Sequence, residues 1–345
     1  MLLNALQARS LYEFAYREKF AVLAINADSP AGIHDCLLAA KQVECPVIIE
    51  TSLWQLEGIS FGAGDALRGM RRYIADTAIL ANSDEFQSVP AIFHTDHIKG
   101  PKTREILGSA VTGLAVALND VVLKLSPSSI SLDASELSAD QNIEFMNYLI
   151  SLSKQSGRPV TLEMEAGVDS GLTSEDEVRR LVEGVEGKNP GYLYIFAPGL
   201  GSRHGHSADG YGEFSPDAVA RNVKIIAACA GREIGIGLHG SSGLTDEQLR
   251  MAVLNGIIKV NWATDSLVSR SQFASEYYRE NAERLQVSNK AFKVTAMDNG
   301  VNAYVSQHYV PVVAKRMRLL GGEGKNRGFW EYSASSGERR QDDSS

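Results

Sequence analysis

Short apolar runs alternate with longer amphipathic segments from the beginning of the chain to about residue 265. The runs are rich in Val, Ile, Leu or Phe and lack the regular polar alternation of a half-exposed strand, which is typical of parallel strands covered on both faces. Eight of them can be counted, at residues 20–27, 45–52, 89–97, 128–135, 158–167, 191–199, 233–243 and 256–265. The pattern therefore predicts eight buried parallel strands.

The segments between these runs have the spacing of helices, and several begin with a capping signal. Ser174 precedes Glu-Asp-Glu-Val, Ser215 precedes Pro216, and Thr245 precedes Asp-Glu-Gln. Strands that alternate with helices eight times favour an α/β fold of the closed (β/α)₈ TIM-barrel type, with an open doubly wound sheet as the alternative. A chain of 345 residues is long enough for such a barrel.

Beyond residue 265 the pattern changes. Two further helical segments predict a C-terminal helical extension, so we expect residues 1–320 to form a single barrel domain. Residues 321–345 are polar and rich in Gly and Ser apart from the aromatic stretch 329–332, and we expect them to form a flexible tail.

Composition mainly excludes classes of protein. The net charge of −8 argues against binding to nucleic acid or to an anionic membrane. No apolar stretch approaches the roughly 20 residues that a transmembrane helix needs, and charges at Arg9, Glu13 and Arg17 break the apolar region of a signal peptide. Three scattered cysteines fit a reducing compartment. We therefore expect a cytoplasmic protein with small-molecule substrates.

Unusual polar residues gather where the predicted strands end, which is where (β/α)₈ enzymes have their active sites. Five of the seven histidines lie in these segments, and the other two, His34 and His308, lie in helical segments where we interpret them as packing residues. Three imidazoles at one barrel mouth, His97, His204 and His239, predict a site for a divalent metal such as Zn²⁺ with one position left open.

The segment His94-Thr95-Asp96-His97 raises a geometric question. Strand alternation places His94 and Asp96 on one face and His97 on the other. We expect a bend at the end of the strand that turns His97 toward the metal and leaves Asp96 beside the substrate.

In these segments the chain resembles the class II, metal-dependent aldolases, the family of fructose-bisphosphate and tagatose-bisphosphate aldolases. Segments that correspond to the family motifs occur in the same order along the chain. The family's H-x-D-H is His-Thr-Asp-His at 94–97, its E-x-E-L-G appears as Glu-Met-Glu-Ala-Gly at 163–167, and its G-T-x-H-G as Gly-Ser-Arg-His-Gly at 201–205. Its H-G-G-S-G appears as His-Gly-Ser-Ser-Gly at 239–243, and its K-x-N-x-D-T-D as Lys-Val-Asn-Trp-Ala-Thr-Asp at 259–265. Asn26 and Ser52 resemble the family's polar residues on the first and second strands.

The resemblance implies a role for each matched residue. His97, His204 and His239 are expected to hold Zn²⁺, or Mn²⁺ or Co²⁺, with Glu165 as an alternate ligand. Catalysis is expected from Asp96, which would exchange a proton with the substrate, and from Asn261, which would steady an enediolate. Substrate and phosphate contacts are expected from Asn26, Ser52, Gly205, Gly240, Ser242 and Thr264. Members of the family also lead us to expect a homo-oligomer, either a dimer or a tetramer.

Four departures from the family pattern affect the expected substrate. Ala263 replaces an Asp, and the Lys that usually follows the strand-6 histidine is absent, so Arg203 or His206 is a candidate substitute. The loop after Gly167 is short and leaves Asp169 as its nearby acid. Ser241 replaces a Gly.

Because the metal ligands and Asp96 are kept while the phosphate contacts change, we predict a C–C lyase that acts on a phosphorylated ketose or related sugar through a metal-stabilised enediolate, with a non-standard substrate. Three alternatives stay open at this point: a transaldolase-like transferase, a metal hydrolase, and a non-catalytic barrel that retains the metal.

Overall fold

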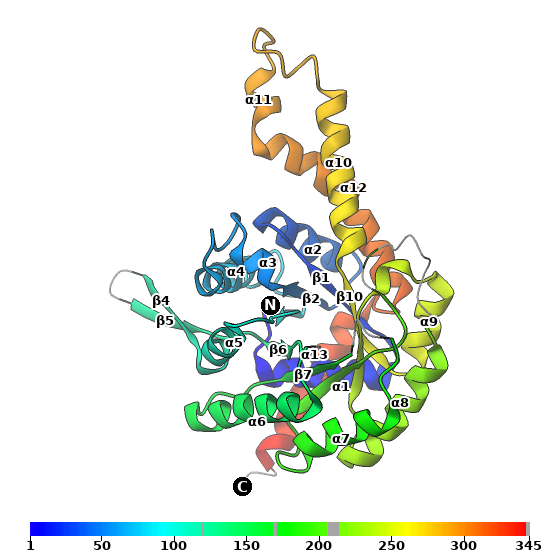
Figure 1. Cartoon of the computed structure of the whole chain (residues 1–345). Coiled ribbons are helices and arrows are strands. Elements are labelled where there is room, and N and C mark those ends of the chain that lie inside the picture. Colours follow the sequence, from blue (N-terminus) through cyan, green and yellow to red (C-terminus); the bar gives the residue numbers. More distant parts are fainter. Residues whose placement is uncertain (119–120, 135, 168–170, 204, 206–213, 343–345) are drawn as a thin grey trace.

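Eight parallel strands close into a barrel in the computed structural model, which describes the chain except residues 119–120, 135, 168–170, 204, 206–213 and 343–345 (Figure 1). The order around the barrel is β1-β10-β9-β8-β7-β6-β3-β2. The strands are β1 (Val22–Asn26), β2 (Val47–Thr51), β3 (Ala91–Thr95), β6 (Ser129–Leu132), β7 (Leu162–Ala166), β8 (Leu193–Pro198), β9 (Gly235–Leu238) and β10 (Ile257–Trp262). Each lies inside one predicted run, so the closed barrel is confirmed over the open sheet.

Helices surround the barrel and connect its strands (Figure 1). Those before the C-terminal extension are α1 (Ala5–Glu18), α2 (Pro30–Gln42), α3 (Leu53–Glu57), α4 (Ala66–Ala81), α5 (Thr103–Thr112), α6 (Ala139–Ser156), α7 (Glu175–Glu186), α8 (Pro216–Ala230), α9 (Asp246–Leu254) and the short 3₁₀ turn η1 (Ser241–Gly243). The predicted caps are confirmed, because the side chains of Ser174, Ser215 and Thr245 accept backbone N–H bonds at the beginnings of α7, α8 and α9.

Helix α1 closes the amino-terminal end of the barrel. Its Leu11 and Tyr12 are buried in one apolar cluster with Val22, Ile92 and Ile258 from three strands. Because this end is filled by apolar side chains, the opposite end, where the strands terminate, is left to form the site.

An antiparallel hairpin of β4 (Leu114–Leu118) and β5 (Val121–Leu125) projects from the barrel and was not predicted (Figure 1). Its sequence signal was present, since two apolar runs flank Asn119-Asp120. The hairpin does not join the barrel, and Val121 and Val122 are exposed.

The predicted C-terminal helices are α10 (Thr264–Glu280), α11 (Phe292–Ala296) and α12 (Asp298–Leu319), and their distal part projects away from the barrel (Figure 1). The expectation of a polar tail after residue 320 is wrong over much of that stretch, which forms α13 (Lys325–Asp342). Phe329 is fully buried and its ring lies 6.2 Å from that of Phe14 on α1. Aromatic burial therefore orders a segment that its polar composition made look unstructured. The assignment of residues 1–320 to one domain stays a prediction.

Within the described residues, every helix is too short or too polar to cross a membrane.

Candidate metal centre

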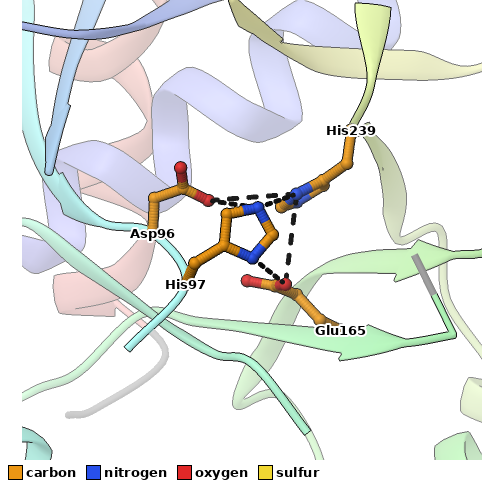
Figure 2. A group of neighbouring side chains, drawn as sticks. All are labelled: Asp96, His97, Glu165 and His239. Carbon is orange, nitrogen blue, oxygen red and sulfur yellow. Dashed lines mark hydrogen bonds and ion pairs between the residues drawn. The ribbon is translucent and has the colours of Figure 1, made fainter. Parts of the chain in front are cut away.

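Four side chains from three strands converge at the open end of the barrel: Asp96 and His97 after β3, Glu165 on β7 and His239 after β9 (Figure 2). Their candidate ligand atoms all lie within 4.8 Å of one another. His97 Nε2 is 3.3 Å from His239 Nδ1, and Asp96 Oδ1 lies 3.6 Å from His97 Nε2. Glu165 Oε2 lies 4.0 Å from His239 Nδ1. The set offers two nitrogens and two carboxylates to a single point.

The bend expected after β3 is present. The strand ends at Thr95, and His97 has a left-handed backbone with φ of 48°, which a residue other than glycine rarely adopts. This conformation sets the His97 ring beside that of His239, with centroids 5.0 Å apart. A sparsely populated backbone at a site of this kind is typical of functional residues held in place by their surroundings.

A carboxylate lies behind each of the two imidazoles. His97 Nδ1 is 2.9 Å from Asp133 Oδ2, and His239 Nε2 is 3.2 Å from Glu163 Oε1. Such a partner draws the ring proton to the outer nitrogen and directs the lone pair of the inner nitrogen into the site. The two inner nitrogens lie 3.3 Å apart, close enough for one cation to bind both.

Glu165 supports the same interpretation. Ser131 donates a hydrogen bond to its Oε1, whereas Oε2 is buried and accepts no hydrogen bond from the described residues. A buried carboxylate oxygen without such a donor is costly. Imidazole nitrogens together with carboxylate oxygens are a donor set that suits Zn²⁺ and its neighbours in the periodic table. The residues present therefore fit a divalent ion.

The electrostatics of the centre are those of a negative pocket. Burial would lower the pKa of His97, but Asp96, Glu165 and Asp133 outweigh burial and raise that pKa well above its ordinary value. Burial alone would raise the pKa of Asp96, yet the neighbouring His97 and His239 lower it to about 2. Asp96 is therefore a carboxylate at neutral pH, and it can accept a proton.

Two amides hold Asp96 in place. Asn26 Nδ2 donates to Asp96 Oδ2 and Asn261 Nδ2 donates to Asp96 Oδ1, each at 3.0 Å. The amide oxygens of both asparagines are buried and take no hydrogen bond from the described part of the chain. These three residues come from β1, from β10 and from the end of β3, so the closed barrel is what brings them together.

A layer of charged side chains fills the barrel beneath the centre. Lys259 Nζ lies 2.9 Å from Glu163 Oε2 and 3.4 Å from Glu50 Oε2, and all three side chains are fully buried. His94 Nε2 lies 3.0 Å from Glu163 Oε2. Burial and Lys259 lower the pKa of His94 to about 4. Sequence reasoning quoted Glu163 and Lys259 within motifs but gave them no role; here Glu163 links His239 to the buried lysine.

A cavity of about 370 Å³ opens above the centre, within the range of small-molecule pockets. Asp96, His97 and Asn261 line it, and so do all six residues that we expected to contact substrate: Asn26, Ser52, Gly205, Gly240, Ser242 and Thr264. Gly240 has a φ of 65°, and a Cβ there would meet the Arg203 carbonyl oxygen at 2.6 Å, so this turn requires glycine.

One expected residue is not brought to the cavity, and three others cannot be placed. Arg203 is exposed and is not among the residues that line it. The third metal-ligand candidate, His204, and the proposed substitutes His206 and Asp169 lie outside the described residues.

Sequence reasoning also missed residues that do line the cavity: Leu53, Trp54, Gln55, Lys99 and Leu267. Each of them follows a strand end, at the beginning of α3, after β3 or in the first turn of α10. Their position was the available signal, but no family motif includes them, and the apolar ones carry no chemical signature in a single sequence.

The comparisons with known proteins point in one direction. Residues 6–325 match the family described as fructose-bisphosphate aldolase class-II. The chain is 26% identical over 330 residues to the fructose-bisphosphate aldolase of Mycoplasma pneumoniae, covering 94% of this chain and all of that one. It is 24% identical over 303 residues to the corresponding protein of Edwardsiella ictaluri, covering 81% of this chain and 82% of that one. The solved structure of the aldolase from Campylobacter jejuni superimposes with a TM-score of 0.78 at 22% identity, over 94% of this chain and 97% of that one, which supports the fold.

Proposed function

Because the chain belongs to the class II fructose-bisphosphate aldolase family, and is therefore a metal-dependent lyase, we propose that it makes or breaks a carbon–carbon bond in a phosphorylated ketose or related sugar. We place the reaction at the centre of Asp96, His97, Glu165 and His239. The observation that carries the proposal is the pair of imidazole nitrogens, 3.3 Å apart, beside a carboxylate that two asparagines hold.

His97 and His239 would hold the ion with Glu165 as a further ligand, and we assign His204 to the same set from the family motif. A divalent ion there, Zn²⁺ in our proposal with Mn²⁺ and Co²⁺ as alternatives, would polarise the substrate ketone and stabilise the negative charge of the enediolate. The carboxylates Asp133 and Glu163 orient the two imidazoles for this purpose.

Asp96 moves the proton. In the cleavage direction its carboxylate accepts the hydroxyl proton of the carbon that becomes the aldehyde, while the electron pair of the broken bond stays with the ketone half. That half then takes one proton at carbon, so the products together contain the atoms of the substrate. Asn26 and Asn261 fix both oxygens of Asp96, which keeps one face of the carboxylate toward the cavity.

We assign phosphate binding to Gly205, Gly240, Ser242 and Thr264, which line the cavity. Glycine-flanked backbone N–H groups and hydroxyls are suited to phosphate oxygens. Ala263 also lines the cavity where the family has an Asp, and this supports a non-standard substrate.

Several finer features belong to the same proposal. We propose that the protein is cytoplasmic, which agrees with its three free cysteines, and that it is a homo-oligomer. We assign it neither a nucleic-acid nor a membrane partner, in keeping with its net charge of −8.

The test is condensation of dihydroxyacetone phosphate with a panel of aldehydes, in metal-loaded protein and after treatment with EDTA. The variant Asp96→Ala should lose a factor of about 10²–10⁴ in turnover while its metal content stays that of the wild type. The matched control is Asp84→Ala, since Asp84 is exposed on the surface. Turnover that survives chelation would overturn the proposal, and a changed ligand affinity without loss of turnover in Asp96→Ala would refute the role of Asp96. Product analysis with two aldehydes separates a lyase from a transferase.

A further inference from the structure

The residues that line the cavity are of two kinds. Those assigned to phosphate are glycines and hydroxyl-bearing residues: Gly205, Gly240, Ser242 and Thr264. The others include apolar residues from the beginning of α3, which follows β2, and from the beginning of α10, which follows β10. In the barrel order β1 lies between β10 and β2, and Asn26 at its end also lines the cavity.

Four of the lining residues are apolar. They are Leu53, Trp54, Ala263 and Leu267, and we call them the apolar shelf. Trp54 is 87% exposed, so its indole ring lies at the mouth of the cavity, whereas the other three are half-buried. A single exposed apolar residue needs no explanation, but a group of apolar residues in the lining of a pocket is typical of a binding surface.

Cationic side chains are scarce in the lining. Among the lining residues that the structure describes, Lys99 is the one with an amine or guanidinium group, and its Nζ lies 3.4 Å from Asp133 and 3.9 Å from Glu136. The amide oxygen of Gln55 accepts the backbone N–H of Ser52 at 2.9 Å. A second phosphate placed on the shelf would therefore lie against carbon instead of cationic donors.

We propose, on the basis of the proposed aldol chemistry, that the aldehyde half of the substrate is uncharged and carries an apolar or aromatic group that packs on the apolar shelf. The ketose is then a monophosphate and not a bisphosphate, and its phosphate is bound by the glycines and hydroxyl groups that line the cavity. In the synthetic direction the donor carbon loses one proton and bonds to the aldehyde carbon. The carbonyl electron pair moves to oxygen, which gains one proton, so no further reactant is needed.

The experiment measures kcat/KM for condensation of dihydroxyacetone phosphate with 3-phenylpropanal, butanal, glyceraldehyde and glyceraldehyde 3-phosphate, using the metal-loaded full chain. We expect 3-phenylpropanal to exceed glyceraldehyde 3-phosphate by at least roughly tenfold, since each buried methylene adds a factor of roughly three to four. A preference for glyceraldehyde 3-phosphate would overturn the inference. The same holds if that preference arises because a second copy of the chain supplies a cation for the second phosphate.

Two variants test the shelf itself. Trp54→Ala should lower kcat/KM for 3-phenylpropanal about tenfold more than for glyceraldehyde, because the smaller aldehyde has little to pack on the indole. The control is Ile59→Ala, since Ile59 is also 87% exposed and does not line the cavity. An equal loss for both aldehydes in Trp54→Ala would refute the shelf.

Failure of the aldol chemistry is recognised separately. Wild-type protein incubated in D₂O with dihydroxyacetone phosphate alone should exchange one carbon-bound proton, whatever aldehyde the shelf prefers. Absence of this exchange would overturn the proposed function and the inference with it. Exchange together with a preference for the phosphorylated aldehyde would overturn the inference alone.

Discussion

At the scale of single residues, the centre depends on how its polar groups are held. The left-handed backbone of His97 sets its ring beside that of His239, and a carboxylate behind each ring, Asp133 or Glu163, selects the nitrogen that faces the site. Asp96 is held by two amides from neighbouring parts of the barrel. Each of these groups therefore depends on a neighbouring polar side chain for its orientation.

The carboxylate behind His239 gives a first prediction. Glu163→Gln should weaken zinc binding by about 10–100-fold, because the amide no longer favours the ring tautomer that faces the metal. The dissociation constant would be measured by competition with a chelating dye. Asp133→Asn provides a second variant behind His97 in case the first does not fold, and the exposed Glu105→Gln serves as the control. Affinities equal to the wild type in both variants would contradict the orienting role.

The motifs pointed to Asp96, His97, Glu165 and His239, and the structure brings these four side chains together, while the roles assigned to them stay predictions. The two asparagines illustrate a contact that the sequence alone does not reveal. Asn26 and Asn261 are 235 positions apart, and only the closed barrel shows that both bind Asp96. The apolar shelf was missed for a related reason, since Leu53 and Leu267 look like ordinary core residues until the cavity is known.

At the scale of elements, apolar runs located every barrel strand because a strand covered on both faces has a composition of its own. Helix α13 and the β4–β5 hairpin lie outside that rule. Polar composition suggested a tail where Phe329 in fact anchors α13 on α1, and the hairpin escaped because it pairs only with itself. Packing against the distant helix α1 orders α13, and the local sequence does not show that contact. The hairpin did have a local signal, but it lies outside the pattern of eight runs.

The anchoring of α13 can be measured. Phe329→Ala should destabilise the protein by about 3–5 kcal/mol, since it removes a fully buried aromatic side chain from its contacts with Phe14 and Phe20. Urea unfolding reports the change, with Arg327→Ala as the control because Arg327 is exposed. An unchanged midpoint in Phe329→Ala would mean that α13 contributes nothing to the fold.

At the scale of the whole molecule, the barrel encloses charge that is sensitive to pH. The pKa of His94 is lowered from 6.5 to about 4, first by burial and then by Lys259. Between these two values the unfolded chain binds more protons than the folded one, so stability falls as the pH falls through this window.

We therefore expect metal-free protein to lose about 2 kcal/mol of unfolding free energy from His94 between pH 7.5 and pH 5. Urea unfolding at both pH values in the presence of EDTA measures the loss. His94→Gln should reduce this pH dependence, whereas the control His308→Gln should keep it. A slope that is the same in both variants would argue against a buried, neutral His94.

Metal binding should also stabilise the whole fold, because His97, Glu165 and His239, from three different strands, would share one ion. Zinc at about 100 times its dissociation constant should add about 2.7 kcal/mol to the free energy of unfolding. A thermal melt of EDTA-treated protein, with and without zinc, tests this, and His239→Ala should remove most of the shift. Identical melts for wild type with and without zinc would contradict the metal site.

The central claim is that this barrel uses a divalent ion and Asp96 to perform aldol chemistry. Its most direct test is the rate of deuterium incorporation into dihydroxyacetone phosphate and its condensation with an aldehyde, followed by NMR in one set of samples. We predict that both reactions proceed in the zinc-loaded wild type and stop after EDTA treatment. Condensation should fall by about 10²–10⁴ in Asp96→Ala with its zinc retained. Equal condensation rates in the wild type, the chelated protein and Asp96→Ala would contradict the account.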